Sequence, residues 1–250
     1  MSRTTPRPFV LLSSRADDHL ARRELDSFLR LSGLPRDAVE HVRMEQGPFT
    51  PLDLDRFAGV VVGGSPFTVT DPPESKSAVQ VRVEAELAGL VRELVARDVP
   101  YLGLCYGIGV TALALGGVVD RELGEPVGEA TIRLTEAAAT DPVFGGLPER
   151  FAAFVGHKES CRRMPDGAVL LATNDACPVQ AYRIGRRAYV TQFHPELEVE
   201  TFVERIRAYA SHGYFHPDEL EDLVEGARDV DVSAAHDVLR RFVVAFADPA

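Results

Sequence analysis

Apolar and polar positions along the first part of the chain predict strands and helices in alternation. The strand candidates are apolar, partly β-branched runs bounded by turn residues, and the helix candidates have apolar positions at helical spacing. The expected strands are residues 9–12, 41–47, 57–65 and 99–105, and the expected helices are residues 13–33 and 77–98. Unbroken apolar strands separated by helices predict an α/β fold with a parallel sheet covered on both faces.

The pattern changes after about residue 128. Short strand candidates follow at residues 129–138, 151–157, 168–175, 178–185 and 187–196, and we expect them to add antiparallel hairpins to the sheet. Helical patterns return beyond Glu196, and two helices within residues 217–246 are expected to pack through Leu220, Leu223, Val224, Leu239, Phe242 and Val243. We predict one domain over residues 1–205 and a C-terminal helical extension over residues 206–250 packed on it.

Length and composition are those of a protein with a full hydrophobic core. The chain has 250 residues, 45% of them hydrophobic, and a formal net charge of −11. This charge repels phosphate backbones and anionic headgroups, so we expect neither a nucleic-acid nor a membrane partner. Arg183, Arg186 and Arg187 lie beside a strand pattern and predict a hairpin turn with solvated charges.

The three cysteines, Cys105, Cys161 and Cys177, form no CxxC pair and no zinc-ligand spacing. Reduced thiols in a cytoplasmic protein are therefore the expectation. The apolar run at residues 9–12 is too short for a signal peptide, and no stretch approaches the roughly 20 apolar residues of a membrane-spanning helix. HExxH, P-loop and dinucleotide motifs are absent, so the sequence indicates neither a metal nor another cofactor.

One short stretch combines a strand end, a thiol and glycines. In YLGLCYGIGV, Gly103, Cys105 and Gly107 have the spacing G-x-C-x-G. This spacing is typical of a nucleophile elbow, in which a strand turns sharply into a helix and exposes the nucleophile at the carboxyl edge of a sheet. A cysteine in an apolar stretch is most often a small buried residue, and the elbow spacing alone leaves this structural role and a catalytic role equally supported. Cys161 and Cys177 lack this context and are expected to be structural.

A base for this thiol is present far along the chain, in AYVTQFHPELE. A thiolate nucleophile needs a base, and the base needs a group that fixes its tautomer. His194 and Glu196 are two residues apart at the end of an expected strand, so their side chains share one face. Adjacent parallel strands would bring both residues to the same sheet edge as Cys105. A second His-Pro-acid string, His216 to Glu219, precedes a helical pattern and is expected to start a helix.

Together these segments resemble the class I, or triad, glutamine amidotransferases, whose glutaminase domains have a G-x-C-x-G-x-Q elbow and a later H-P-E. The segments VVGGSP, DPVFGGLPERF and QAYRIGRRAYVTQFHPE also follow in the family's order. The similarity covers roughly residues 9–205 and is strongest to the glutaminase domain of GMP synthase. It implies a flavodoxin-like three-layer sandwich with a mostly parallel central sheet.

The resemblance also implies roles for individual residues. Cys105, His194 and Glu196 are implied as a triad that hydrolyses the side-chain amide of glutamine through a cysteine thioester.

Further positions are implied around this triad. The backbone N–H groups of Tyr106 and of the Gly63–Gly64 turn are implied as the oxyanion site, and an ordinary strand-ending turn is the alternative for the two glycines. His157, in FVGHKES, is implied as a pocket or interface residue, with a hydrogen-bonded loop histidine as the alternative.

The chain departs from the family pattern at Gly109, where the family has glutamine. Loss of that amide would forfeit about 1–3 kcal/mol of substrate hydrogen bonding, and it predicts a more open pocket. Three functions stay open: a glutaminase that supplies ammonia to a separate synthase subunit, a freestanding hydrolase of γ-glutamyl peptides or amides, and a noncatalytic binding protein on the same scaffold. The sequence does not decide between a monomer and a homodimer.

Overall fold

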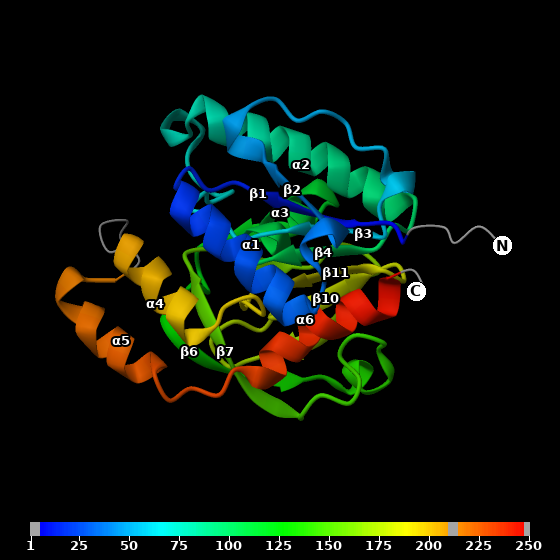
Figure 1. Ribbon diagram of the computed structural model, residues 1–250. Coiled ribbons are helices and arrows are strands. Elements are labelled where there is room, and N and C mark those ends of the chain that lie inside the picture. The colour runs from blue at the N-terminus through cyan, green and yellow to red at the C-terminus, as the bar shows by residue number, and fades with distance from the viewer. Residues whose placement is uncertain (1–5, 210–214, 248–250) are drawn as a thin grey trace.

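The computed structural model describes residues 6–209 and 215–247, and its centre is a nine-stranded sheet with helices on both faces (Figure 1). In spatial order the strands are β2 (Val39–Arg43), β1 (Phe9–Ser13), β3 (Gly59–Val62), β4 (Tyr101–Leu104), β11 (Ala188–Thr191), β10 (Ala181–Ile184), β9 (Val169–Thr173), β6 (Glu125–Leu134) and β7 (Arg150–His157). The first five strands run parallel, and each of the other four is antiparallel to its neighbours. The sequence predicts this mixed sheet correctly.

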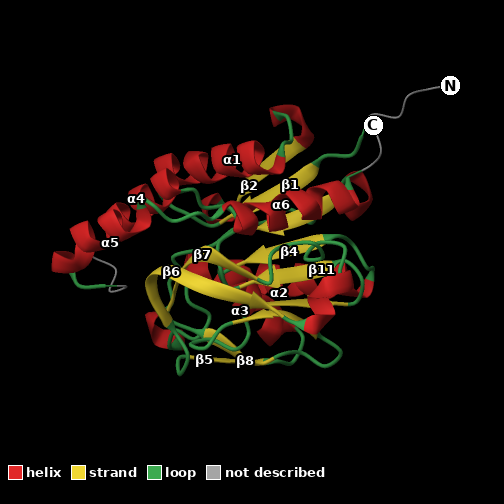
Figure 2. Ribbon diagram, turned by 90° about the horizontal axis from the view of Figure 1, so that it is seen from below, coloured by secondary structure: helices red, strands yellow, loops and turns green. Residues whose placement is uncertain are grey.

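Helices cover both faces of the parallel half (Figure 2). α1 (Asp18–Ser32) and α6 (Ser233–Phe246) pack on one face, and α2 (Ala78–Ala96) and α3 (Tyr106–Ala114) pack on the other. The sequence predicts α1 because both of its ends and its buried face have clear signals. Its N-cap Asp17 accepts from the N–H of Leu20, and the helix ends at Gly33 in the left-handed conformation. Its buried side chains form one stripe.

The two C-terminal helices do not pack as predicted. α4 (Val199–Ala208) and α5 (Leu220–Ala227) form a cluster with β7, in which the rings of Phe154 and Phe202 stack with centroids 4.0 Å apart. Leu220, Leu223 and Val224 lie in this cluster, whereas Leu239, Phe242 and Val243 of α6 lie in the core beneath α1. The stripe of α5 covers α4 and β6, whereas the stripe of α6 covers the sheet beside α1. The division at residue 205 falls inside α4 and stays a prediction.

Some local structure is not visible in the sequence. β5 (Val118–Asp120) and β8 (Ser160–Arg163) form a separate two-stranded sheet, and both strands are too short to show a period. The strand expected at residues 41–47 begins at Val39 and ends at Arg43. Single 3-10 turns lie at Arg36–Ala38, Met44–Gln46, Leu54–Arg56, Pro73–Ser75, Glu136–Thr140 and Pro217–Glu219.

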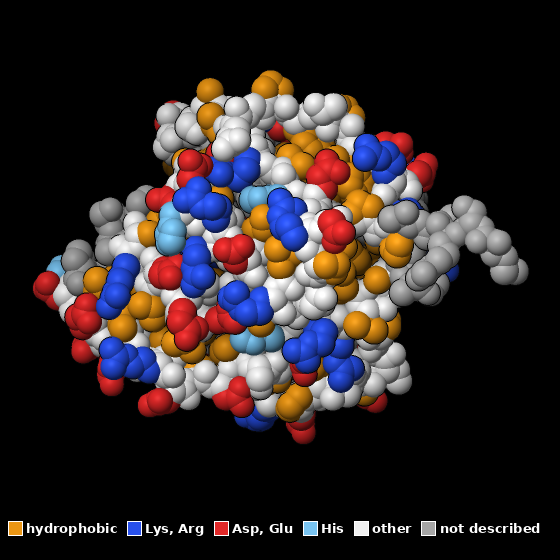
Figure 3. Space-filling model, viewed as in Figure 1, with side chains coloured by type: hydrophobic (Ala, Val, Ile, Leu, Met, Phe, Trp, Pro, Cys, Tyr) orange, Lys and Arg blue, Asp and Glu red, His pale blue; other side chains and the backbone are white. Residues whose placement is uncertain are grey.

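Charges are mixed on the face shown in Figure 3, where basic and acidic side chains alternate over α1 and α4. Arg23 of α1 pairs with Glu204 of α4 at 2.7 Å, and Arg30 of α1 pairs with Glu198, the N-cap residue of α4. Within the described ranges, no helix combines the length and the apolar character needed to cross a bilayer.

Candidate active site

Cys105 lies at the bend between β4 and α3, as the G-x-C-x-G spacing predicts. Its backbone has φ 48° and ψ −88°, a region that residues with side chains rarely adopt. The bend is held by the N–H of Cys105, which donates to the carbonyl of Thr191 over 2.7 Å. A Cβ at position 103 would come within 2.5 Å of the Tyr101 hydroxyl, so Gly103 allows the close packing. The thiol is left half-buried at the carboxyl end of β4.

His194 and Glu196 follow β11, which lies beside β4 with Thr191 opposite Leu104. The main-chain N–H of His194 donates to the carbonyl of Phe154 over 2.9 Å, which fixes the segment against β7. Its ring Nδ1 lies 2.7 Å from Oε1 of Glu196, and both side chains are buried. The neighbouring strands therefore place the cysteine and the His–Glu pair at one edge of the sheet, as predicted.

The His194–Glu196 pair has strongly shifted pKa values. Burial disfavours the charged form of both groups, but their mutual attraction outweighs this effect. The carboxylate of Glu196, together with Cys105, raises the pKa of His194 to about 9. His194, and then Arg205, lower the pKa of Glu196 to about 2. The carboxylate is therefore ionised at neutral pH and holds a hydrogen on Nδ1 of the ring.

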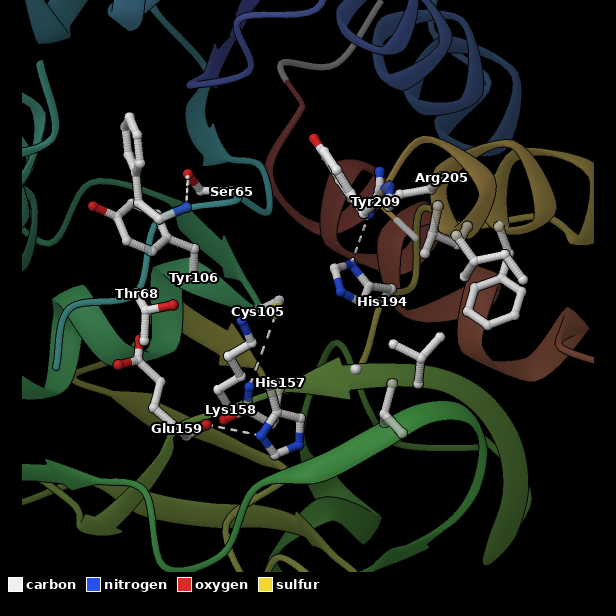
Figure 4. A pocket seen from close by; sticks show the side chains of 18 of the residues that line it. Ser65, Thr68, Cys105, Tyr106, His157, Lys158, Glu159, His194, Arg205 and Tyr209 are labelled. Carbon is white, nitrogen blue, oxygen red and sulfur yellow. Dashed lines mark hydrogen bonds between the residues drawn. The ribbon is translucent and has the colours of Figure 1, made fainter. Parts of the chain in front are cut away.

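A cleft of about 710 Å³, including space open to solvent, contains the thiol and the imidazole (Figure 4). Polar side chains lie on the Cys105 side, where Figure 4 shows Lys158 extending toward Cys105. His194 and Arg205 lie on the other side. Apolar residues from β6, β7, α4 and the loop before α4 complete the lining: Val127, Val155, Leu197, Phe202 and Ile206.

The oxyanion candidates differ in how their N–H groups are used. Tyr106 is the first residue of α3, where N–H groups have no acceptor within the helix. The N–H of Gly63 donates to the carbonyl of Leu12 over 3.0 Å and is therefore not available to an oxyanion. Gly64 remains the candidate donor in this turn. A Cβ at position 64 would lie 2.9 Å from Cε1 of His194, so glycine there lets the turn approach the imidazole.

His157 lines the cleft but is buried at the end of β7. Its Nδ1 lies 2.8 Å from the carbonyl of Glu159, and its Nε2 lies 2.8 Å from Oε2 of Glu125. Both ring nitrogens are thus engaged by the protein, as in the hydrogen-bonded alternative, although His157 ends strand β7 rather than lying in a loop.

Within the described part of the chain, Glu125, His157 and Cys177 form a group that could hold a metal ion, because their donor atoms lie within 4.8 Å of one another. A metal-bound cysteine must be a thiolate. Burial raises the pKa of Cys177 to about 12, and its thiol donates to the carbonyl of Val179 over 3.7 Å. Hydrogen bonds within the protein, between His157 and Glu125 and from Cys177 to Val179, explain why these side chains lie together. Cys161 is also buried, and burial raises its pKa to about 12.

The family model for glutamine amidotransferase class-I matches residues 37–209 of the chain. The protein belongs to the class I glutamine amidotransferase family. The matched region includes Cys105, His194 and Glu196, and the resemblance drawn from the motifs is confirmed.

Individual relatives of this amidotransferase fall into two kinds. A glutamine-hydrolyzing GMP synthase subunit of Methanopyrus kandleri is 30% identical over 185 residues, which cover 72% of this chain and 83% of that protein. The glutamine-hydrolyzing GMP synthase of Streptomyces avermitilis is 30% identical over 118 residues, which cover 47% of this chain but 22% of that protein. In fold, a glutamine amidotransferase from Thermotoga maritima has a TM-score of 0.76 at 20% identity, with 96% of this chain and 98% of that chain covered. This likeness confirms the flavodoxin-like fold.

Gly109 does not open the amidotransferase pocket. A Cβ at position 109 would lie 3.2 Å from Oε1 of Glu159 and 3.2 Å from Cγ2 of Val69, so neighbouring side chains fill the space. The Glu159 carboxylate is fixed there, because it accepts from the N–H groups of Val69 and Thr70 and from the Thr70 hydroxyl. The expectation of a more open pocket at this position is therefore wrong.

Three residues of the cleft lining, Gln192, Arg15 and Arg205, are not predicted from the sequence. Nε2 of Gln192 lies 4.0 Å from Sγ of Cys105, and its Oε1 has no hydrogen-bond partner among the described residues. Gln192 directly follows β11, which ends at Thr191, so it lies at the same strand end as His194. Arg15 and Arg205 also line the cleft, and no local motif marks either of them.

Proposed function

We propose that this protein hydrolyses the side-chain amide of glutamine through a thioester on Cys105. The observation that carries the proposal is the 2.7 Å contact between Nδ1 of His194 and Oε1 of Glu196, in a cleft shared with the thiol. The carboxylate orients the ring and stabilises its charged form, which leaves Nε2 for proton transfer with the substrate.

The proposed reaction has two stages. In the first, His194 takes the proton from the Cys105 thiol and Sγ attacks the amide carbon. The carbon–nitrogen bond then breaks as His194 gives this proton to the departing nitrogen, which leaves as ammonia. In the second, His194 takes a proton from water, the water oxygen attacks the thioester carbon, and the carbon–sulfur bond breaks to release glutamate while His194 returns the proton to Sγ. The N–H groups of Tyr106 and Gly64 are the proposed donors to the oxyanion in both stages.

We further propose that the ammonia passes to a separate synthase subunit. The Methanopyrus kandleri relative supports this partner class, because it is named as one subunit of a glutamine-hydrolyzing GMP synthase. The cleft includes space that is open to solvent, which would allow ammonia to leave it and reach another protein.

A second candidate is hydrolysis of a larger γ-glutamyl amide. Apolar side chains of β6, β7 and α4 line part of the cleft, and ammonia as the leaving group is too small and polar to use an apolar surface. A γ-glutamyl amide with an apolar leaving amine would bury part of itself there.

The deciding experiment is a substrate panel of glutamine and γ-glutamyl amides assayed for released amine, with Cys105→Ala as the control. Release of ammonia from glutamine, lost in the control, supports the first candidate. Preference for larger amides supports the second, and no turnover of any substrate would favour a noncatalytic binding protein. An electrophilic glutamine analogue should label residue 105, and a label confined to Cys161 or Cys177 would remove Cys105 from the proposal.

A further inference from the structure

The Glu196 carboxylate has a second neighbour besides the imidazole. Its Oε1 lies 2.7 Å from Nδ1 of His194 and 3.2 Å from Nη1 of Arg205 in α4. Its Oε2 is buried without a hydrogen-bond partner among the described residues. One carboxylate oxygen is therefore shared by the ring and the guanidinium, and Arg205 helps to fix its position.

Arg205 is held from its far side by a second buried acid. Its Nη2 lies 3.8 Å from Oε1 of Glu24 in α1. The same oxygen accepts from Nε of Arg15 over 3.0 Å, and the hydroxyl of Ser13 donates to the other oxygen over 2.7 Å. Arg15 in turn donates to the hydroxyl of Tyr209 over 2.9 Å. The charges therefore alternate in sign outward from the imidazole.

The turn after β3 is shaped to this cluster. A Cβ at position 63 would lie 2.7 Å from Oε1 of Glu24, and a Cβ at position 64 would lie 3.2 Å from Nη2 of Arg15. Glycine at both positions lets the backbone approach the charged groups. Arg15 and Glu24 precede residues 37–209, so this part of the cluster lies outside the region that the family model matches.

We infer that Arg205 is a positioning residue, which fixes the Glu196 carboxylate and opposes protonation of His194, while Glu24 and Arg15 hold it in place. The inference deepens the proposed function and rests on His194 as its acid–base group. Nη1 of Arg205 lies 3.3 Å from Nδ1 of His194, and a cation this close disfavours a second positive charge on the ring. Glu196 and Cys105 favour that charge, so Arg205 balances them.

The direct test is an NMR titration of the His194 ring in the full chain, with its signal assigned by its loss in His194→Asn. Arg205→Met and Arg205→Gln should each raise the pKa of His194 by about one unit, because a nearby cation is lost. Arg205→Lys should stay close to the wild type. Arg23→Met is the matched control, because it removes another ion pair between α1 and α4 without touching the site. An unchanged His194 titration in a folded Arg205→Met or Arg205→Gln protein would overturn the inference.

Turnover gives a second readout. Groups that orient a metal ligand through a hydrogen bond contribute about 10- to 100-fold to activity. By analogy we expect a similar loss of kcat in Arg205→Met and Arg205→Gln, with KM little changed and partial recovery in Arg205→Lys. A merely structural arginine would lower stability without moving the His194 titration. The NMR titration needs no substrate, so an inactive wild type would refute the proposed function and leave this test intact.

Discussion

The chain contains two His-Pro-acid strings, and they have opposite environments. In the first, the side chains of His194 and Glu196 are 9% and 1% exposed, and Nδ1 lies 2.7 Å from the carboxylate. In the second, the side chains of His216 and Asp218 are 70% and 90% exposed, and Nδ1 lies 3.4 Å from the carboxylate. The same residue types therefore form a buried ion pair in one place and a solvated contact in the other.

The difference comes from what each string follows. His194 comes after a buried strand whose neighbour carries Cys105, so the sheet edge encloses it. His216 precedes a 3-10 turn over Pro217–Glu219, and its N–H donates to the Glu219 side chain over 2.7 Å as part of a helix start. Because solvent screens the exposed pair, its interaction is worth little. A short motif acquires its chemistry from the element that presents it.

Replacing the histidines should separate the two strings most. His194→Asn removes the proposed acid–base group and should lower kcat by about 10⁴- to 10⁶-fold. His216→Asn should leave kcat within twofold, because its ring is exposed and does not line the cleft. Steady-state release of ammonia from glutamine measures both. Activity in folded His194→Asn comparable to that of the wild type would remove His194 from the mechanism.

The acids should differ next. Glu196→Gln keeps the shape of the side chain but removes the charge that raises the pKa of His194. We expect kcat to fall by about 10²- to 10⁴-fold, and we expect the loss of activity at alkaline pH to begin at a lower pH than in the wild type. Asp218→Asn should change neither quantity. Equal profiles for Glu196→Gln and the wild type would show that the 2.7 Å contact has no catalytic role.

Stability should depend on pH through the first string. The pKa of Glu196 is lowered from 4.5 to about 2, so its contribution is present above pH 4.5 and is lost as the pH falls toward 2. The pKa of His194 is raised from 6.5 to about 9, so its contribution is complete below pH 6.5 and is lost as the pH rises through 9.

The two shifts describe one interacting pair, worth about 3 kcal/mol at most. Urea unfolding between pH 3 and 10 should show both losses in the wild type and in His216→Asn. A His194→Asn/Glu196→Gln double variant should have a flatter profile. Parallel profiles for the wild type and the double variant would contradict the assigned pKa shifts.

Two glycines near the strings should show the smallest effects. Gly64→Ala places a Cβ 2.9 Å from Cε1 of His194, and the displaced ring should lower kcat by about tenfold. Gly226 in α5 has nothing within 4 Å of an added Cβ, so Gly226→Ala should raise the free energy of unfolding by about 0.5–1 kcal/mol and leave kcat unchanged. Steady-state kinetics and urea unfolding test both variants. An unchanged kcat in Gly64→Ala would show that the turn can move to accommodate the added Cβ.

Much of the fold could be read from the sequence because its signals are local. The strands β1, β3 and β4 and the helices α1 and α2 all have a clear period or terminal residues, and the elbow at Cys105 is marked by its glycines. β5 and β8 were missed because three or four residues carry no period. The partners of α5 and α6 were mistaken because an apolar stripe does not say which surface it will cover.

The sequence by itself determined the α/β alternation, the bend at Cys105 and the strand end that carries His194 and Glu196, because each depends on residues close together in the chain. Only the tertiary structure decided that Glu159 fills the space beside Gly109 and that Arg205, Glu24 and Arg15 lie in alternation behind the imidazole. Charged residues far apart in the chain have no period or spacing that reveals their partners. These ion pairs form when folding removes water from the charged side chains, because a buried charge is stabilised by a neighbouring group of opposite charge.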